Sequence, residues 1–109
     1  MILVVGGYNQ GKMNYVNQRG LEGYTILDKY HERIRKQLED KLDPIKEVET
    51  LINENDKLVI ICDEVGYGLV PMDSFERAYR ETVGRVCCLV AEKADEVIRV
   101  VAGIGMKIK

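Results

Sequence analysis

The 109-residue sequence has no tryptophan, one phenylalanine and one histidine. Its formal net charge of −2 leaves no basic surface for nucleic acid, so we expect no partner of that class. The three cysteines, Cys62, Cys87 and Cys88, form no C-x-x-C pair, and His31 is the single histidine. The sequence therefore offers too few suitably spaced ligands to favour a zinc site. We expect the cysteines to be small core residues in a reducing compartment.

Long apolar runs are also lacking. No run approaches the roughly 18 residues of a membrane-spanning helix, and no charged leader precedes an apolar segment. These absences predict a cytoplasmic protein with no membrane partner. The remaining composition, 46% apolar and 31% charged residues, is ordinary for a globular protein, and the length fits a single domain over residues 1–109.

The most informative stretch is the first thirteen residues, MILVVGGYNQGKM. Its apolar start predicts a strand buried on both faces of a parallel sheet. The pattern G-x-x-x-x-G-K that follows is most of a phosphate-binding loop, in which backbone N–H groups and the start of the next helix converge on an anion. The predicted nucleotide-binding residues are Gly6, Gly7, Tyr8, Asn9, Gln10, Gly11, Lys12 and Met13.

One position departs from that pattern. Such a loop should close with a serine or threonine whose hydroxyl binds Mg²⁺, and this chain has Met13. A thioether is a poor ligand for a hard cation. We therefore expect a retained anion site whose affinity depends weakly on Mg²⁺. The alternative is a glycine-rich turn that merely packs a helix on a sheet.

Two carboxylates follow a second apolar run, over residues 58–62. Asp63 and Glu64 should face the same edge of the sheet as the loop, since the carboxyl ends of parallel strands share one edge. Both are candidate catalytic residues, and Asp63 is a candidate metal ligand that would replace the lost hydroxyl. The alternative is ordinary strand-end carboxylates that accept backbone N–H bonds. Tyr8 and Tyr67 could stack on a base, or they are exposed loop tyrosines.

Alternating strand and helix signals predict an α/β fold, a three-layer sandwich with a small, mainly parallel sheet and a P-loop-like first βα turn. Strands are expected over residues 2–5, 24–27, 58–62 and 96–102, helices over 12–19, 28–42, 44–55 and 73–93, and a short basic tail over 103–109. Asp28, Asp43 and Asp73 are expected to cap the last three of these helices. The helix capped by Asp28 has a thin apolar stripe, which predicts a surface helix or a contact with a partner subunit. On it we expect His31 to be solvated.

Several stretches resemble the adenosylcobinamide kinase/adenosylcobinamide-phosphate guanylyltransferase family of cobalamin assembly, chiefly its C-terminal third. They are the first strand and loop, DEVGYGLVP from Asp63, GRV from Gly84, ADEV from Ala94 and AGIGMKIK from Ala102. The resemblance implies phosphorylation of a cobinamide hydroxyl by a purine nucleoside triphosphate, then transfer of GMP from GTP through a histidine-linked intermediate. It also implies a recombinase-type phosphate-loop fold, GTP or ATP as ligand, a corrinoid partner and a homotrimer.

The departures from this family bear on catalysis. The family's nucleophilic histidine ends an R-I-x-x-H pattern, and this chain has Gln37 there, whose amide is no nucleophile. The family has asparagine at Asp63 and serine at Met13. Its middle strand, which bears an acidic metal-site residue, is not found between residues 44–55 and 58–63. These changes predict a nucleotide binder with impaired or lost catalysis. The alternative is a binding or assembly module that keeps only the scaffold.

Overall fold

The structure is a computed structural model, described here for residues 1–65 and 73–109. These residues form the strands β1 (Ile2–Gly6), β2 (Thr25–Leu27), β3 (Leu58–Asp63), β4 (Glu96–Val101) and β5 (Ile104–Lys107), and the helices α1 (Lys12–Arg19), α2 (Tyr30–Glu39), α3 (Pro44–Glu54) and α4 (Ser74–Lys93). No helix among them is long and apolar enough to span a membrane.

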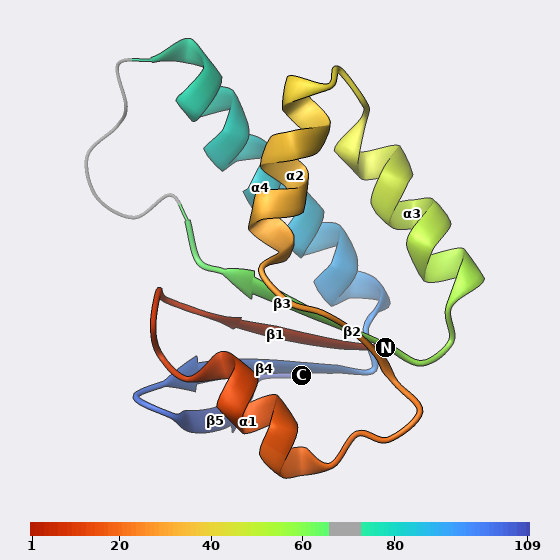
Figure 1. The fold of residues 1–109 in the computed structure, drawn as a ribbon, viewed down its shortest axis with the longest axis vertical. Coiled ribbons are helices and arrows are strands. Elements are labelled where there is room, and N and C mark those ends of the chain that lie inside the picture. The colour runs from red at the N-terminus through yellow and green to blue at the C-terminus, as the bar shows by residue number, and fades with distance from the viewer. Residues whose placement is uncertain (66–72) are drawn as a thin grey trace.

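The strands form one mixed sheet in the order β2-β3-β1-β4-β5. β1 pairs in parallel with β3 on one side and with β4 on the other, so that Leu3 lies between Ile60 and Val97. β2 adds in parallel to β3, and β5 adds antiparallel to β4. Figure 1 shows β1 in the middle of this sheet. Four of its five residues are buried and the fifth is partly buried. The continuous apolar run of β1 is explained by this central position, because both faces are covered.

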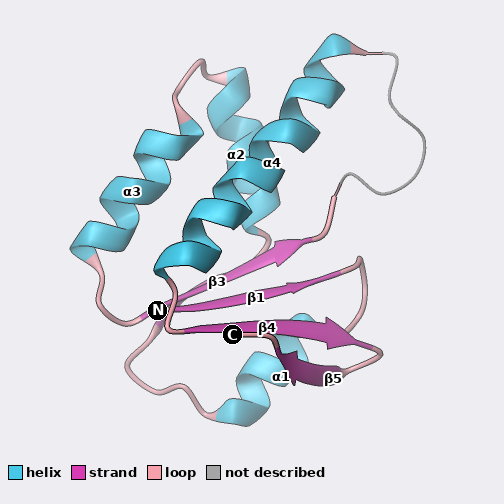
Figure 2. Cartoon of the chain, turned by 180° about the vertical axis from the view of Figure 1, so that it is seen from behind, coloured by secondary structure: helices cyan, strands magenta, loops and turns pink. Residues whose placement is uncertain are grey.

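Helices cover both faces of the sheet. α2, α3 and α4 lie on one side and α1 on the other (Figures 1 and 2). An apolar cluster fills each interface; the larger one includes Leu3 and Ile60, and the smaller one includes Val4, Val16 and Ile61. Alternate residues of the central strands therefore point into different clusters, as the pleat requires. The predicted α/β fold and its mainly parallel sheet are confirmed.

The segment after β4 was predicted as a basic tail, and that prediction is wrong. Val101 pairs with Ile104 across a two-residue turn in which Ala102 and Gly103 both have positive φ, 49° and 78°. This is the arrangement of a hairpin turn that matches the twist of its strands. The chain therefore returns as β5, and the sheet has five strands.

α2 lies on the surface of the fold with a polar outer face, but its inner face is packed more closely than its thin apolar stripe predicted. Tyr30 and Ile34 are 1% and 0% exposed, and the helix packs against α3, α4 and β3. The guanidinium of Arg35 covers the ring of Tyr79 on α4, 4.1 Å from the ring centroid, which extends the contact beyond the apolar stripe. The helix also begins later than predicted. Asp28 accepts the Lys29 N–H, and it is Lys29, in a left-handed conformation, that precedes the first turn.

The other two predicted caps are confirmed. The Asp43 carboxylate accepts the N–H groups of Ile45 and Lys46, and the Asp73 carboxylate accepts those of Phe75 and Glu76. Each carboxylate satisfies donors that the first turn of a helix leaves open.

Candidate functional site

The Gly6–Met13 loop leaves the carboxyl end of β1 and leads directly into α1. Asn9 and Gly11 have positive φ, 60° and 83°, and turn the chain back toward the sheet. Gly11 caps α1 without any side-chain hydrogen bond, so the first N–H groups of the helix are not taken by a capping oxygen. A helix start of this kind presents donors and a partial positive charge to an anion.

Lys12 turns its side chain into the loop. Only 8% of the side chain is exposed. Its Nζ atom donates to the carbonyl oxygen of Gly7 at 2.6 Å and lies 2.7 Å from Oδ1 of Asp63. The ammonium group is therefore held between the loop backbone and the end of β3. A buried lysine needs such partners, because an unpaired charge out of water is strongly destabilising.

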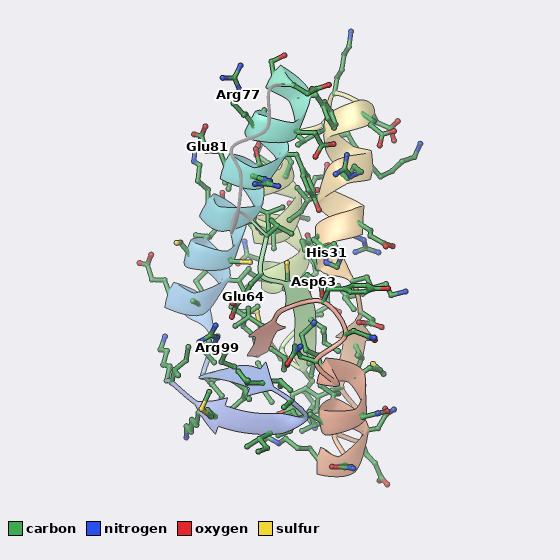
Figure 3. All side chains as sticks on the ribbon, turned by 90° about the vertical axis from the view of Figure 1, so that its left-hand side faces the viewer. His31, Asp63, Glu64, Arg77, Glu81 and Arg99 are labelled. Atoms are coloured by element: carbon green, nitrogen blue, oxygen red, sulfur yellow. The ribbon has the colours of Figure 1, made fainter. Side chains whose placement is uncertain are left out.

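Asp63 reaches this position because β1 and β3 are paired in register, with Gly6 opposite Asp63. Its backbone N–H donates to Nδ1 of His31 at 3.1 Å, and its Oδ2 lies 3.5 Å from Nε2 of the same ring. Because Nδ1 accepts this bond, the proton of a neutral ring lies on Nε2. Figure 3 shows His31 and Asp63 side by side at the edge of the sheet.

The prediction of His31 as a solvated residue is wrong, since its side chain is only 12% exposed. The sequence contained one signal for this position. β2 leads into α2, so the first turn of α2 must start at the same edge of the sheet at which β1 and β3 end. His31 lies in that first turn.

A pocket of about 450 Å³ opens beside these groups, which is the size of a small-molecule site. We call it the loop pocket. It is lined by the loop, the start of α1, the start of α2 and the end of β3, through Tyr8, Asn9, Gln10, Gly11, Lys12, Met13, Asn14, Asp28, Lys29, His31, Glu32 and Asp63. Six of the eight predicted nucleotide-binding residues are thus brought together, and Gly6 and Gly7 are not among the lining residues.

Glu64, the other candidate carboxylate, does not line the loop pocket. Its two oxygens accept hydrogen bonds from Arg99 on β4, at 2.8 and 3.1 Å, and Figure 3 shows the two side chains turned toward each other. Tyr8 is 82% exposed at the rim, as the alternative interpretation expected. Its proposed stacking partner, Tyr67, lies outside the described residues.

The loop rests on the turn between β4 and β5, a contact that sequence reasoning missed. The side-chain Oε1 of Gln10 accepts the N–H of Ala102 at 2.8 Å, and the Gln10 carbonyl accepts the N–H of Gly103 at 2.8 Å. A Cβ on Gly11 would lie 3.4 Å from the Cα of Gly103. The segment AGIG, noticed only for its resemblance, therefore supports the loop.

Gln37 lies away from the loop pocket. It is buried, and it borders a smaller cavity between α2 and α3, of about 230 Å³, together with Tyr30, Glu47 and Leu51. A side chain at this position faces α3 within the chain and not the loop. Gln37 follows His31 by six residues, which places the two side chains about 120° apart around α2. The two side chains therefore face different neighbours.

The cysteines differ from one another. Cys62 is buried beside Asp63. The pKa of its thiol is raised well above the ordinary range, first by the thiol of Cys87 and second by burial. It is therefore an inert core thiol. Cys87 is half-buried and Cys88 exposed, so the prediction of core positions is wrong for Cys88. Among the described residues, no group of three His, Cys, Asp or Glu side chains could hold a metal ion.

Comparison with known proteins agrees with the resemblance. Residues 23–108 match the family described as cobinamide kinase / cobinamide phosphate guanyltransferase. The chain is 49% identical over 53 residues to the bifunctional adenosylcobalamin biosynthesis protein CobU of Salmonella typhimurium and 47% identical over 53 residues to that of Escherichia coli. Each alignment covers 49% of this chain and 29% of the relative. The chain belongs to the cobinamide kinase / cobinamide phosphate guanyltransferase family.

Proposed function

We propose that this chain binds the phosphate groups of a purine nucleotide, GTP or ATP, in the Gly6–Met13 loop, as a family member that has lost guanylyl transfer. The observation that carries the proposal is the position of Lys12, whose ammonium group lies inside the loop and borders the loop pocket. The family match begins at residue 23, so support for the loop comes from its own geometry.

Three features of the loop suit an anion. The start of α1 supplies N–H groups without a side-chain cap, and the helix dipole adds a partial positive charge. Lys12 supplies a full charge for the outer phosphates. The positive φ values of Asn9 and Gly11 give the backbone the concave shape on which such a loop depends.

The proposed loss of guanylyl transfer depends on Gln37. A histidine-linked intermediate needs a nucleophilic ring at that position, and a glutamine amide cannot form the phosphorus–nitrogen bond. Its burial beside α3 also separates it from the loop pocket. Within the proposed function, Lys12 and the start of α1 bind and orient the phosphates, and a corrinoid of the family's substrate class is the expected second ligand.

A non-catalytic assembly module is the second candidate, and Met13 favours it. The side chain lines the loop pocket at the point where a metal-binding hydroxyl would stand, and it also packs against the cluster under α1. Incubation with cobinamide and a nucleoside triphosphate separates the two candidates. Formation of cobinamide phosphate would establish an enzyme, and binding without product would favour the module.

Calorimetric titration with GTP and with ATP tests nucleotide binding directly. We expect Lys12→Ala to weaken binding by about 1.5–3 kcal/mol, because it removes hydrogen bonds to a charged group. Lys46→Ala is the matched control: it removes the same charge from the exposed side of α3 and should leave affinity unchanged. Absence of binding by the unmodified protein, or equal affinity of the Lys12 and Lys46 variants, would refute the proposal.

A further inference from the structure

We propose that the ion pair between Asp63 and Lys12, called the lock below, holds the lysine in the unliganded protein. The ligand that breaks this ion pair is a metal-complexed oligophosphate. Such a ligand carries both a cation for Asp63 and an anion for Lys12, so one ion pair is exchanged for two. The inference rests on the proposed function, and it names the form of nucleotide that the loop pocket accepts.

The first step is the pairing of Lys12 itself. Its Nζ atom already has a carbonyl partner at 2.6 Å and a carboxylate partner at 2.7 Å. The two paired side chains are 8% and 17% exposed, so water screens the pair poorly. A metal-free anion that takes the lysine must leave a poorly solvated carboxylate without its counter-ion, which opposes binding.

The second step is that Asp63 is held in place. Its backbone pairs with Gly6 in the sheet and donates to Nδ1 of His31, so the residue cannot withdraw by a local change of backbone. Oδ2 lies 3.5 Å from Nε2 of the same histidine, a longer separation than the 2.7 Å between Oδ1 and the Lys12 ammonium group. When Lys12 turns to a phosphate, the carboxylate therefore stays at the pocket and requires a new cation.

The third step is the fit of the cation. Mg²⁺ is commonly bound by one or two carboxylates together with substrate phosphates and several waters. Asp63 offers such oxygens beside the loop, whereas Met13 offers none. Glu64 is paired with Arg99 and does not line the pocket. Because the described residues contain no three-ligand cluster, the metal should arrive with the phosphates and not bind first. This geometry favours Asp63 as the metal ligand in place of the lost hydroxyl. It therefore favours binding that depends strongly on Mg²⁺, whereas Met13 alone predicted weak dependence.

The test is calorimetric titration with sodium tripolyphosphate and with GTP, each with EDTA or with excess Mg²⁺. The unmodified protein should bind the Mg²⁺ complex at least about tenfold more tightly than the metal-free anion. Asp63→Asn should bind the metal-free anion at least about tenfold more tightly than the unmodified protein and lose most of the Mg²⁺ effect. Asp63→Ser should behave alike, and it serves if the asparagine variant folds poorly.

Asp28→Asn is the matched control. It removes one negative charge from the same pocket, but the Asp28 carboxylate contacts the Lys29 N–H and not Lys12. The Mg²⁺ effect should persist in this variant. If both substitutions raised the affinity for the metal-free anion equally, a general effect of charge would explain the gain and the lock would be refuted. Equal affinities with and without Mg²⁺ in the unmodified protein would refute the lock. The proposed nucleotide site would still be supported in that case if Lys12→Ala weakened binding. No binding under any condition would overturn the proposed function as well.

Discussion

A Cβ atom placed on Gly6 would lie 2.5 Å from the carbonyl oxygen of Val100. Gly6 ends β1 and does not have a positive φ, whereas Gly11 does. Gly6 and Gly11 therefore serve different purposes in the loop. Gly11 provides a left-handed turn, and Gly6 permits the end of β1 to lie against β4.

Replacing Gly6 with alanine should destabilise the protein by about 1–3 kcal/mol, because a backbone oxygen cannot move aside as a flexible side chain can. Urea unfolding measures the change. Gly84→Ala is the control: no atom lies within 4 Å of a Cβ at that site in α4, so alanine should stabilise the helix by roughly 0.5–1 kcal/mol. A Gly6 variant as stable as the unmodified protein would contradict the steric argument.

Guanylyl transfer should be absent, because Gln37 provides no nucleophile. After incubation with GTP labelled at the α-phosphate and denaturation, we expect no acid-labile label on the protein. Gln37→His should not restore labelling within one chain, since the new ring would lie between α2 and α3. Label on the unmodified protein would refute the prediction, and its position at His31, which lines the loop pocket, would show where the chemistry had moved.

The ion pair between Arg19 and Glu96 should make stability depend on pH. Two hydrogen bonds of 3.2 Å join them and attach α1 to β4. The Arg19 guanidinium lowers the pKa of Glu96. A lowered carboxyl pKa stabilises the fold above the unfolded value of about 4.3, and this contribution is lost as the pH falls through the folded value.

Arg19→Gln should therefore lower stability by about 0.5 kcal/mol at neutral pH, the size expected for a partly exposed pair. The difference from the unmodified protein should vanish in acid, which thermal unfolding across pH would show. Arg85→Gln is the control, because the Arg85–Glu81 pair is 3.8 Å long and mostly exposed. A difference for Arg19→Gln that persists unchanged in acid would indicate lost packing and not lost charge.

We predict a homo-oligomer, most simply a trimer. β2 and β5 are the edges of the sheet, and on and after β5 the apolar side chains of Ile104, Met106 and Ile108 are exposed. Edges of this kind favour association, and closed cyclic contacts would cover them. The number three comes from the family resemblance alone. Light scattering that gives 12.4 kDa, the mass of one chain, across dilution would refute association, and a dimer would refute the number.

The strength of local signals decided what could be predicted from the sequence. Apolar runs identified β1 and β3, and aspartate caps located the starts of α3 and α4. β5 was missed because its hairpin turn has alanine at a position with positive φ, where glycine or asparagine would be the usual signal. The surroundings of His31 were missed, although its place in the first turn after β2 indicated the right edge of the sheet, because its contact with Asp63 joins residues 32 positions apart.

The hydrogen bond between Gln10 and Ala102 also has a consequence for folding, because it joins residues 92 positions apart. A contact of such high sequence separation costs loop-closure entropy, and it can form only once β4 and β5 have reached the end of β1. The anion site at the start of the chain should therefore mature only when the β4–β5 hairpin docks. A nucleotide that binds only this completed form would stabilise the whole sheet by mass action, so ligand occupancy would report the last stage of assembly.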